Sequence, residues 1–148
     1  MENMELFSAD INSHEKQSEQ SGVQHPGFTS TAKHLMENAI DLNRDLVVHP
    51  ESTFYARVRG ESMRDIGVGD GDILMVDKSI DWQSGDLAVC VYNGEFIVKL
   101  VEVRDNRLLL QSANDGCPPI EVSECDEFEI WGVVTYVIHK MRGRTKNV

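Results

Sequence analysis

The stretch DLAVCVYNGEFIVKLVEV, residues 86–103, decides the fold class. Two runs rich in β-branched residues meet at Asn93-Gly94, a pair that tolerates the positive φ angles of a tight hairpin turn. Gly, Asn and Asp punctuate shorter apolar runs on both sides of this stretch, at 52–60, 72–77, 107–111 and 127–140. Short strands separated by turn residues are typical of an all-β unit. We therefore expect a compact, mostly β domain of several short strands with a hairpin at Asn93-Gly94.

The first part of the chain has a different composition. Residues 1–27 carry many acidic side chains against a single lysine, Lys16, and their apolar residues follow no sustained period. Such a segment buries too little apolar surface to fold alone, so we expect a flexible N-terminal arm. A connecting segment at 28–45 follows, with weak helical periodicity at 31–43, and then the β domain at 46–142. The basic tail at 143–148 is expected to be a solvated end.

Bulk composition limits the classes of function. The chain has 148 residues, enough for one domain with a core, and a net charge of −11, which argues against a direct grip on nucleic-acid phosphates. It shows no signal peptide and no apolar run of membrane-spanning length, so we expect a cytoplasmic location and no membrane partner. The three cysteines lack CxxC spacing and no Cys/His cluster has zinc spacing. We expect reduced thiols, no metal and no cofactor.

Ser62 follows the run at 52–60 within Gly-Glu-Ser-Met and has two interpretations. The spacing of Ser62 and Asp65 matches a capping box, in which serine and an acid three residues later bond free amides at a helix start. Alternatively, Ser62 is a nucleophile, because unpaired backbone N–H groups at such a turn can face an oxyanion. A serine nucleophile also needs a base.

Lys99 is the candidate base. It lies in EFIVKLVEV, residues 95–103, where apolar residues occupy both strand faces next to it. Burial disfavours the charged form of an amine, and a neutral amine is a competent general base. The alternative is a lysine that reaches past the sheet edge to water, or pairs with Glu95 or Glu102. Ser62 and Lys99 together give a modest signal for a Ser-Lys dyad.

The two motifs carry a family resemblance. GESMRDIGVGDGDILMVD at 60–77, followed by SGDLAVCVYNGEFIVKLVEV at 84–103, closely resembles the catalytic domain of the LexA-like self-cleaving peptidases. The short arm, Gly27-Phe28 and the run at 39–63 are similar to the UmuD-like mutagenesis proteins of the bacterial SOS response. The resemblance covers residues 22–142. It implies a LexA/signal-peptidase-like β domain at 46–142 that serves for both peptide cleavage and dimerisation.

The resemblance also implies an activity. Ser62 would be the nucleophile, Lys99 the neutral base that activates it, and the backbone amides of Glu61 and Ser62 the oxyanion donors. The chain would be a serine endopeptidase that cleaves its own N-terminal arm when a RecA–single-stranded DNA filament stimulates it. The trimmed homodimer, with contacts that include residues 131–138, would join an error-prone Y-family DNA polymerase in translesion synthesis and mutagenesis.

The cleavage bond departs from the family pattern. The cut bond in this family has alanine or cysteine before glycine, whereas alignment on Gly27-Phe28 places Pro26 there. Proline lacks an N–H group and has a fixed φ angle, so it cannot bind as a strand residue would. Pro26-Gly27 and Ser21-Gly22 therefore stay open as alternatives. The departure also motivates a second hypothesis, a dimeric polymerase accessory subunit that binds without cleaving and whose dyad is vestigial.

Overall fold

The computed structural model describes residues 4–8 and 39–143 of the chain. Both candidate cleavage bonds, at Pro26-Gly27 and Ser21-Gly22, lie outside the described residues. The elements in chain order are β1 (Glu5–Ser8), α2 (Leu42–Leu46), η1 (Pro50–Ser52), β2 (Thr53–Arg57), η2 (Arg64–Ile66), β3 (Ile73–Asp77), β4 (Leu87–Tyr92), β5 (Glu95–Arg104), β6 (Arg107–Gln111), β7 (Ile120–Glu121) and β8 (Phe128–Ile138).

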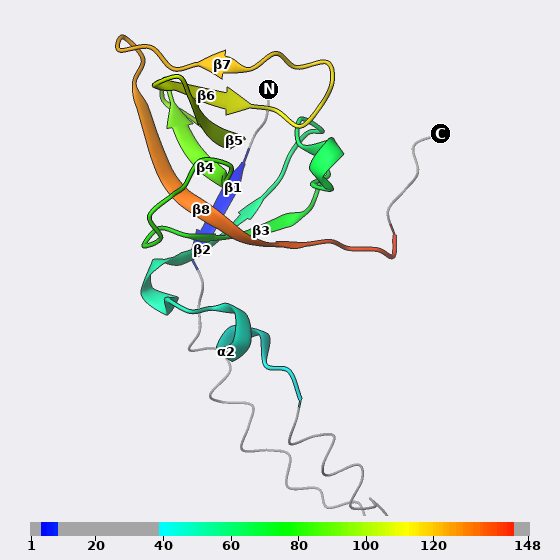
Figure 1. Cartoon of the computed structure of the whole chain (residues 1–148). Coiled ribbons are helices and arrows are strands. Elements are labelled where there is room, and N and C mark those ends of the chain that lie inside the picture. Colours follow the sequence, from blue (N-terminus) through cyan, green and yellow to red (C-terminus); the bar gives the residue numbers. More distant parts are fainter. Residues whose placement is uncertain (1–3, 9–38, 144–148) are drawn as a thin grey trace, which may run out of the picture.

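The strands form one eight-stranded sheet in the order β1-β2-β3-β8-β4-β5-β6-β7. Every neighbouring pair is antiparallel. The last strand, β8, runs between β3 and β4 and joins the two halves of the sheet, while α2 lies at the end away from β6 and β7 (Figure 1). The expected mostly β fold class is confirmed. No helix in the described ranges is long and apolar enough to cross a membrane.

Two tight turns set the register around β5. Asn93 and Gly94 have φ angles of 48° and 83°, and Tyr92 pairs with Glu95 across them, so the predicted hairpin is confirmed. A second turn at Asp105-Asn106, with φ angles of 51° and 58°, joins β5 to β6. Positive φ at both central residues is the type I′ geometry, whose twist matches that of the flanking strands.

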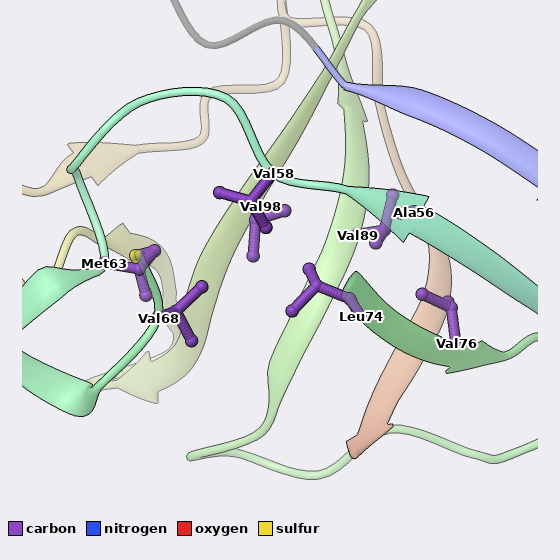
Figure 2. Packing of buried hydrophobic residues seen from close by; sticks show 8 residues of the cluster. All are labelled: Ala56, Val58, Met63, Val68, Leu74, Val76, Val89 and Val98. Atoms are coloured by element: carbon purple, nitrogen blue, oxygen red, sulfur yellow. The ribbon is translucent and has the colours of Figure 1, made fainter. Parts of the chain in front are cut away.

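The core consists of two buried clusters on either side of β5. Figure 2 shows cluster 1, in which Met63 packs beside Val68, and strands β2 to β5 and Val58, which directly follows β2, supply the other side chains. Its buried members are Ala56, Val58, Met63, Val68, Leu74, Val76, Val89 and Val98. The buried members of cluster 2 are Ala88, Cys90, Val101 and Leu110. Because Val98 belongs to cluster 1 and Val101 to cluster 2, both faces of β5 are covered.

Several element boundaries differ from the sequence-based expectation. The strand expected over 52–60 ends at Arg57, and the arm contributes the short strand β1, which pairs with β2 from Glu5↔Arg57 to Ser8↔Phe54. The last strand, expected over 127–140, is apolar on both faces in the sequence, which indicates either cover on both sides or use as an interface. Gly132 and Val133 are buried and Val137 packs against cluster 1, whereas Tyr136 and Ile138, on the opposite strand face from Val137, are exposed.

Candidate active site

Lys99 lies in the middle of β5 and is only 8% exposed. It pairs with Ala88 of β4 and shares a strand face with Ile97 and Val101, which pack in or against cluster 2. The expected burial is therefore confirmed. Its Nζ atom donates a hydrogen bond to Ser112 Oγ at 2.6 Å. The amine thus has a fixed polar contact in surroundings that are otherwise largely apolar.

Two other side chains, one on β5 and one on the paired strand β4, bear on the chemistry of Lys99. Glu102, one of the carboxylates considered as a partner, accepts a hydrogen bond from Arg104 Nη2 at 2.6 Å and another from Gln111. Burial raises the pKa of the Cys90 thiol to about 12, and the positive charge of Lys99 acts in the opposite direction. Because the thiolate is the nucleophilic form of cysteine, Cys90 stays protonated and unreactive in this environment.

Ser62 lies in the loop between β2 and η2. Its Oγ atom is buried and has no hydrogen-bond partner among the described residues. The capping-box interpretation is wrong, because the N-cap of η2 is Met63 and no side chain caps this turn. The turn begins one residue later than the box requires and is a 3₁₀ turn of three residues, Arg64–Ile66. The Ser62 hydroxyl therefore neither caps η2 nor donates a hydrogen bond to any other residue in 4–8 and 39–143.

One segment holds the loop that carries Ser62. We call residues 60–63 the serine loop and residues 112–114, which directly follow β6, the anchor segment. Three hydrogen bonds join the anchor segment to the serine loop and the start of η2: Asp65 N to Ala113 O at 2.8 Å, Asn114 Nδ2 to Glu61 O at 3.1 Å, and Ala113 N to Met63 Sδ at 3.5 Å. The first residue of the anchor segment, Ser112, holds Lys99. The anchor segment therefore bonds Lys99 directly and bonds Glu61 and Met63, the residues on either side of Ser62.

The backbone of the serine loop leaves two amides available. Gly60 has a φ angle of 104°, which turns the chain out of β2, and its N–H donates to Asp70 Oδ1 at 2.9 Å. Further along, the Arg64 N–H donates to Glu61 O at 3.2 Å. Between these bonds, the N–H groups of Glu61 and Ser62 donate to no described residue. Both amides can thus donate hydrogen bonds to an oxyanion.

A small polar pocket adjoins the anchor segment. Its volume is about 280 Å³, and its lining comprises Asp65, Gln111, Ser112, Ala113, Asn114, Asp115, Cys117 and Pro119. Polar groups on the anchor segment and on η2 face this space. In the described part of the chain, no group of three or more His, Cys, Asp and Glu side chains could hold a metal ion.

The structure brings most of the predicted site into one region. Lys99 and the serine loop contact the same anchor segment, and Val98 and Met63, their neighbours in the chain, pack in cluster 1. No hydrogen bond joins Lys99 Nζ to Ser62 Oγ. Sequence reasoning missed Ser112. Counting the β5–β6 register through the turn at Asp105-Asn106 would have placed it opposite Lys99.

Comparison with known proteins identifies the family. A family model described as Peptidase S24-like matches residues 22–135. The protein ImpA of Escherichia coli is 39% identical over 116 residues, which are 78% of this chain and 79% of ImpA. MucA of Escherichia coli is 37% identical over 111 residues, 74% of this chain and 75% of MucA. The LexA repressor of Clostridium kluyveri is 32% identical over 99 residues, 67% of this chain and 49% of the repressor. The resemblance seen in the motifs is confirmed, and the chain belongs to the Peptidase S24-like family.

Proposed function

We propose that this chain is a serine endopeptidase that cleaves its own N-terminal arm, with Ser62 as nucleophile and Lys99 as general base. The observation that carries the proposal is the buried Ser62 Oγ, which bonds none of the described residues and lies in a loop held by the segment that also binds the buried Lys99 amine. Leaving a buried hydroxyl unpaired costs about 1–3 kcal/mol. A reaction that uses this hydroxyl accounts for its retention.

The chemistry follows from these groups. Lys99 in its neutral form takes the proton of the Ser62 hydroxyl while Oγ attacks the carbonyl carbon of the scissile bond. The amides of Glu61 and Ser62 stabilise the resulting oxyanion. The ammonium of Lys99 then gives its proton to the leaving amine, the C–N bond breaks, and an ester links the arm to Ser62. Water hydrolyses that ester with Lys99 again as base, which releases the arm as a carboxylate.

The family relationship supports a wider role in the SOS response. The resemblance to UmuD-like proteins, together with the similarity to ImpA and MucA, favours stimulation by a RecA–single-stranded DNA filament. In this proposal, the trimmed homodimer acts with an error-prone Y-family DNA polymerase in translesion synthesis and mutagenesis. The net charge of −11 favours recruitment of this chain through protein contacts over direct binding to DNA.

An apolar groove supports the homodimer. It has a volume of about 370 Å³ and lies beside α2 over strands β2, β3 and β8, lined by Leu42, Asn43, Leu46, Tyr55, Ala56, Arg57, Ile73, Met75 and Ile138. Tyr136 and Ile138, at the exposed end of β8, are 45% and 41% exposed. Large exposed apolar side chains that gather beside a groove are typical of association surfaces.

Intact-mass analysis of the purified chain tests the peptidase. Wild type, Ser62→Ala and Lys99→Ala are incubated at neutral and alkaline pH, with and without RecA–single-stranded DNA filament. We expect loss of the arm from wild type only, faster at alkaline pH, and the new mass identifies the cut bond. Ser52→Ala and Lys78→Ala are matched controls, because Ser52 Oγ is likewise buried without a described partner and Lys78 is an exposed lysine over Trp131. A shortened Ser62→Ala chain would refute the assignment.

The accessory-subunit alternative rests on Pro26, which stands where the family has alanine or cysteine. It predicts that the full-length chain binds the polymerase and that Ser62→Ala leaves mutagenesis unchanged. The peptidase proposal predicts that Ser62→Ala abolishes mutagenesis and that genetic removal of the arm restores it. Measurement of induced mutation frequency with full-length wild type, full-length Ser62→Ala and the arm-deleted chain separates the two.

A further inference from the structure

We propose that Ser112 is a positioning residue that orients the Lys99 amine toward Ser62. This inference rests on the proposed peptidase function and deepens it. Ser112 is half-buried and directly follows β6, outside both motifs that carry the family resemblance. It holds Lys99 through its side chain and makes no hydrogen bond to Ser62 Oγ, so its effect on the reaction passes through Lys99.

The sheet register places Ser112 where it can hold the amine. Leu100 of β5 pairs with Gln111, the last residue of β6, and one further step along both chains brings Lys99 opposite Ser112. Directly opposed residues of antiparallel strands point to the same face. The side chains meet accordingly, with 2.6 Å between Lys99 Nζ and Ser112 Oγ. The contact thus follows from the tight turn at Asp105-Asn106, which fixes this register.

A fixed contact of this kind has a chemical consequence. A neutral amine carries two N–H donors and one lone pair, and only the lone pair can take the Ser62 proton. Lysine ends in a flexible four-carbon stem whose terminal group rotates freely unless it is bonded. When one N–H donates to Ser112 Oγ, the position of Nζ and the directions open to the lone pair become restricted. General-base catalysis depends on such placement within hydrogen-bond reach of the proton.

The same segment also fixes the other half of the site. Ala113 and Asn114 bond the serine loop and the start of η2. Rigid attachment of both groups to one short segment keeps the amine and the hydroxyl in register with each other, which is the requirement for preorganised catalysis. Ser112 therefore acts as the connection between Lys99 and the part of the chain that positions Ser62.

The test compares wild type, Ser112→Ala and Ser112→Thr in unassisted self-cleavage across neutral to alkaline pH. We expect Ser112→Ala to reduce the rate about tenfold at every pH, because orientation is lost whatever the protonation state. Ser112→Thr keeps the hydroxyl and should restore most of the rate. Ser84→Ala is the matched control, since the Ser84 hydroxyl also accepts a hydrogen bond from β5, from the Val103 N–H at 2.9 Å, and should leave the rate unchanged.

A readout independent of cleavage accompanies the rates. NMR relaxation of ¹³C at the Lys99 ε-methylene reports whether its side chain is held. We expect higher mobility in Ser112→Ala and wild-type order in Ser112→Thr, with a melting temperature that falls by only a few degrees. If wild type does not cleave itself even with the RecA–single-stranded DNA filament, the proposed function fails, while unchanged Lys99 mobility in Ser112→Ala would still refute the positioning role.

Three outcomes of the rate measurements would overturn the inference. The first is a wild-type rate in Ser112→Ala. The second is a defect that disappears at alkaline pH, because Ser112 would then only influence protonation. The third is an equal loss in Ser112→Ala and Ser112→Thr with a large fall in melting temperature, because the role would then be structural.

Discussion

Replacement of Lys99 by methionine separates what the amine contributes to chemistry from what it contributes to the fold. Methionine has a side chain of similar length without charge or hydrogen-bond donors, and the site it would enter is only 8% exposed. Its neighbours in the sheet are apolar: Ile97 and Val101 lie on the same face of β5, and Ala88 of β4 pairs with Lys99. The substitution Lys99→Met should therefore keep the packing of β5 and remove only Nζ and its bonds.

The magnitudes favour a stable but inactive variant. Loss of the bond to Ser112 Oγ costs about 1 kcal/mol, and the half-buried Ser112 hydroxyl can bond water instead. Replacement of a buried ionic group by a well-packed apolar one is often neutral or stabilising by about 1–4 kcal/mol. The free energy of unfolding should thus lie between about 1 kcal/mol below wild type and about 3 kcal/mol above it. Self-cleavage should fall by a factor of about 10²–10⁴, the usual contribution of a general base.

Urea denaturation and intact-mass analysis on the same preparations measure both quantities. Lys78→Met is the control, because Lys78 is exposed and contacts the ring of Trp131 instead of a hydroxyl. A loss of more than about 2 kcal/mol in Lys99→Met would show that the amine is retained for the fold, contrary to our reasoning. Undiminished cleavage would show that another group serves as base.

Three further predictions concern the surrounding fold. A Cβ atom at Gly132 would lie 2.6 Å from the nearest β3 side-chain carbon, so Gly132→Ala should lower the free energy of unfolding by about 1–3 kcal/mol, and an unchanged urea midpoint would contradict this. Because burial raises the pKa of Cys90 to about 12, iodoacetamide should modify the two exposed cysteines of the native chain and spare Cys90; equal labelling in mass spectra would be inconsistent with that. Burial alone would raise the pKa of Asp77, but hydrogen bonds from Ser79 and His49 hold it below its ordinary value. A carboxylate with a depressed pKa stabilises the fold above its unfolded pKa, and this contribution is lost as pH falls through the folded one, so Asp77→Asn should reduce the acid sensitivity of the melting temperature.

The fold class could be predicted because its strongest signal is local. Asn93-Gly94 between two β-rich runs specifies a hairpin without reference to the rest of the chain, and the structure has that hairpin. The burial of Lys99 was predictable for a similar reason, since apolar residues on both faces of one strand imply cover on both sides.

Other features depend on geometry that short motifs do not encode. The spacing of Ser62 and Asp65 fits a capping box, yet the turn begins at a different residue and leaves Ser62 Oγ without a cap bond. The contact between Lys99 and Ser112 depends on the turn at Asp105-Asn106. This turn has no glycine that would indicate its positive φ angles in the sequence. The strand β1 is too short for a periodicity, so only its pairing with β2 reveals it.

The energetics of the site explain why the anchor segment matters. A Ser62 hydroxyl that is buried without a partner in the described part of the chain and a buried amine at Lys99 each oppose folding, by about 1–3 kcal/mol for the hydroxyl alone. Such groups persist only where the surrounding structure holds them in place, because relaxation of either would relieve its cost. The serine loop contributes one buried residue, Met63, to cluster 1. Its hydrogen bonds to the rest of the domain join it to Asp70, to Val68 and to residues 113 and 114. The anchor segment, which bonds both Lys99 and the serine loop, thus helps to hold both unfavourable groups where the proposed reaction needs them.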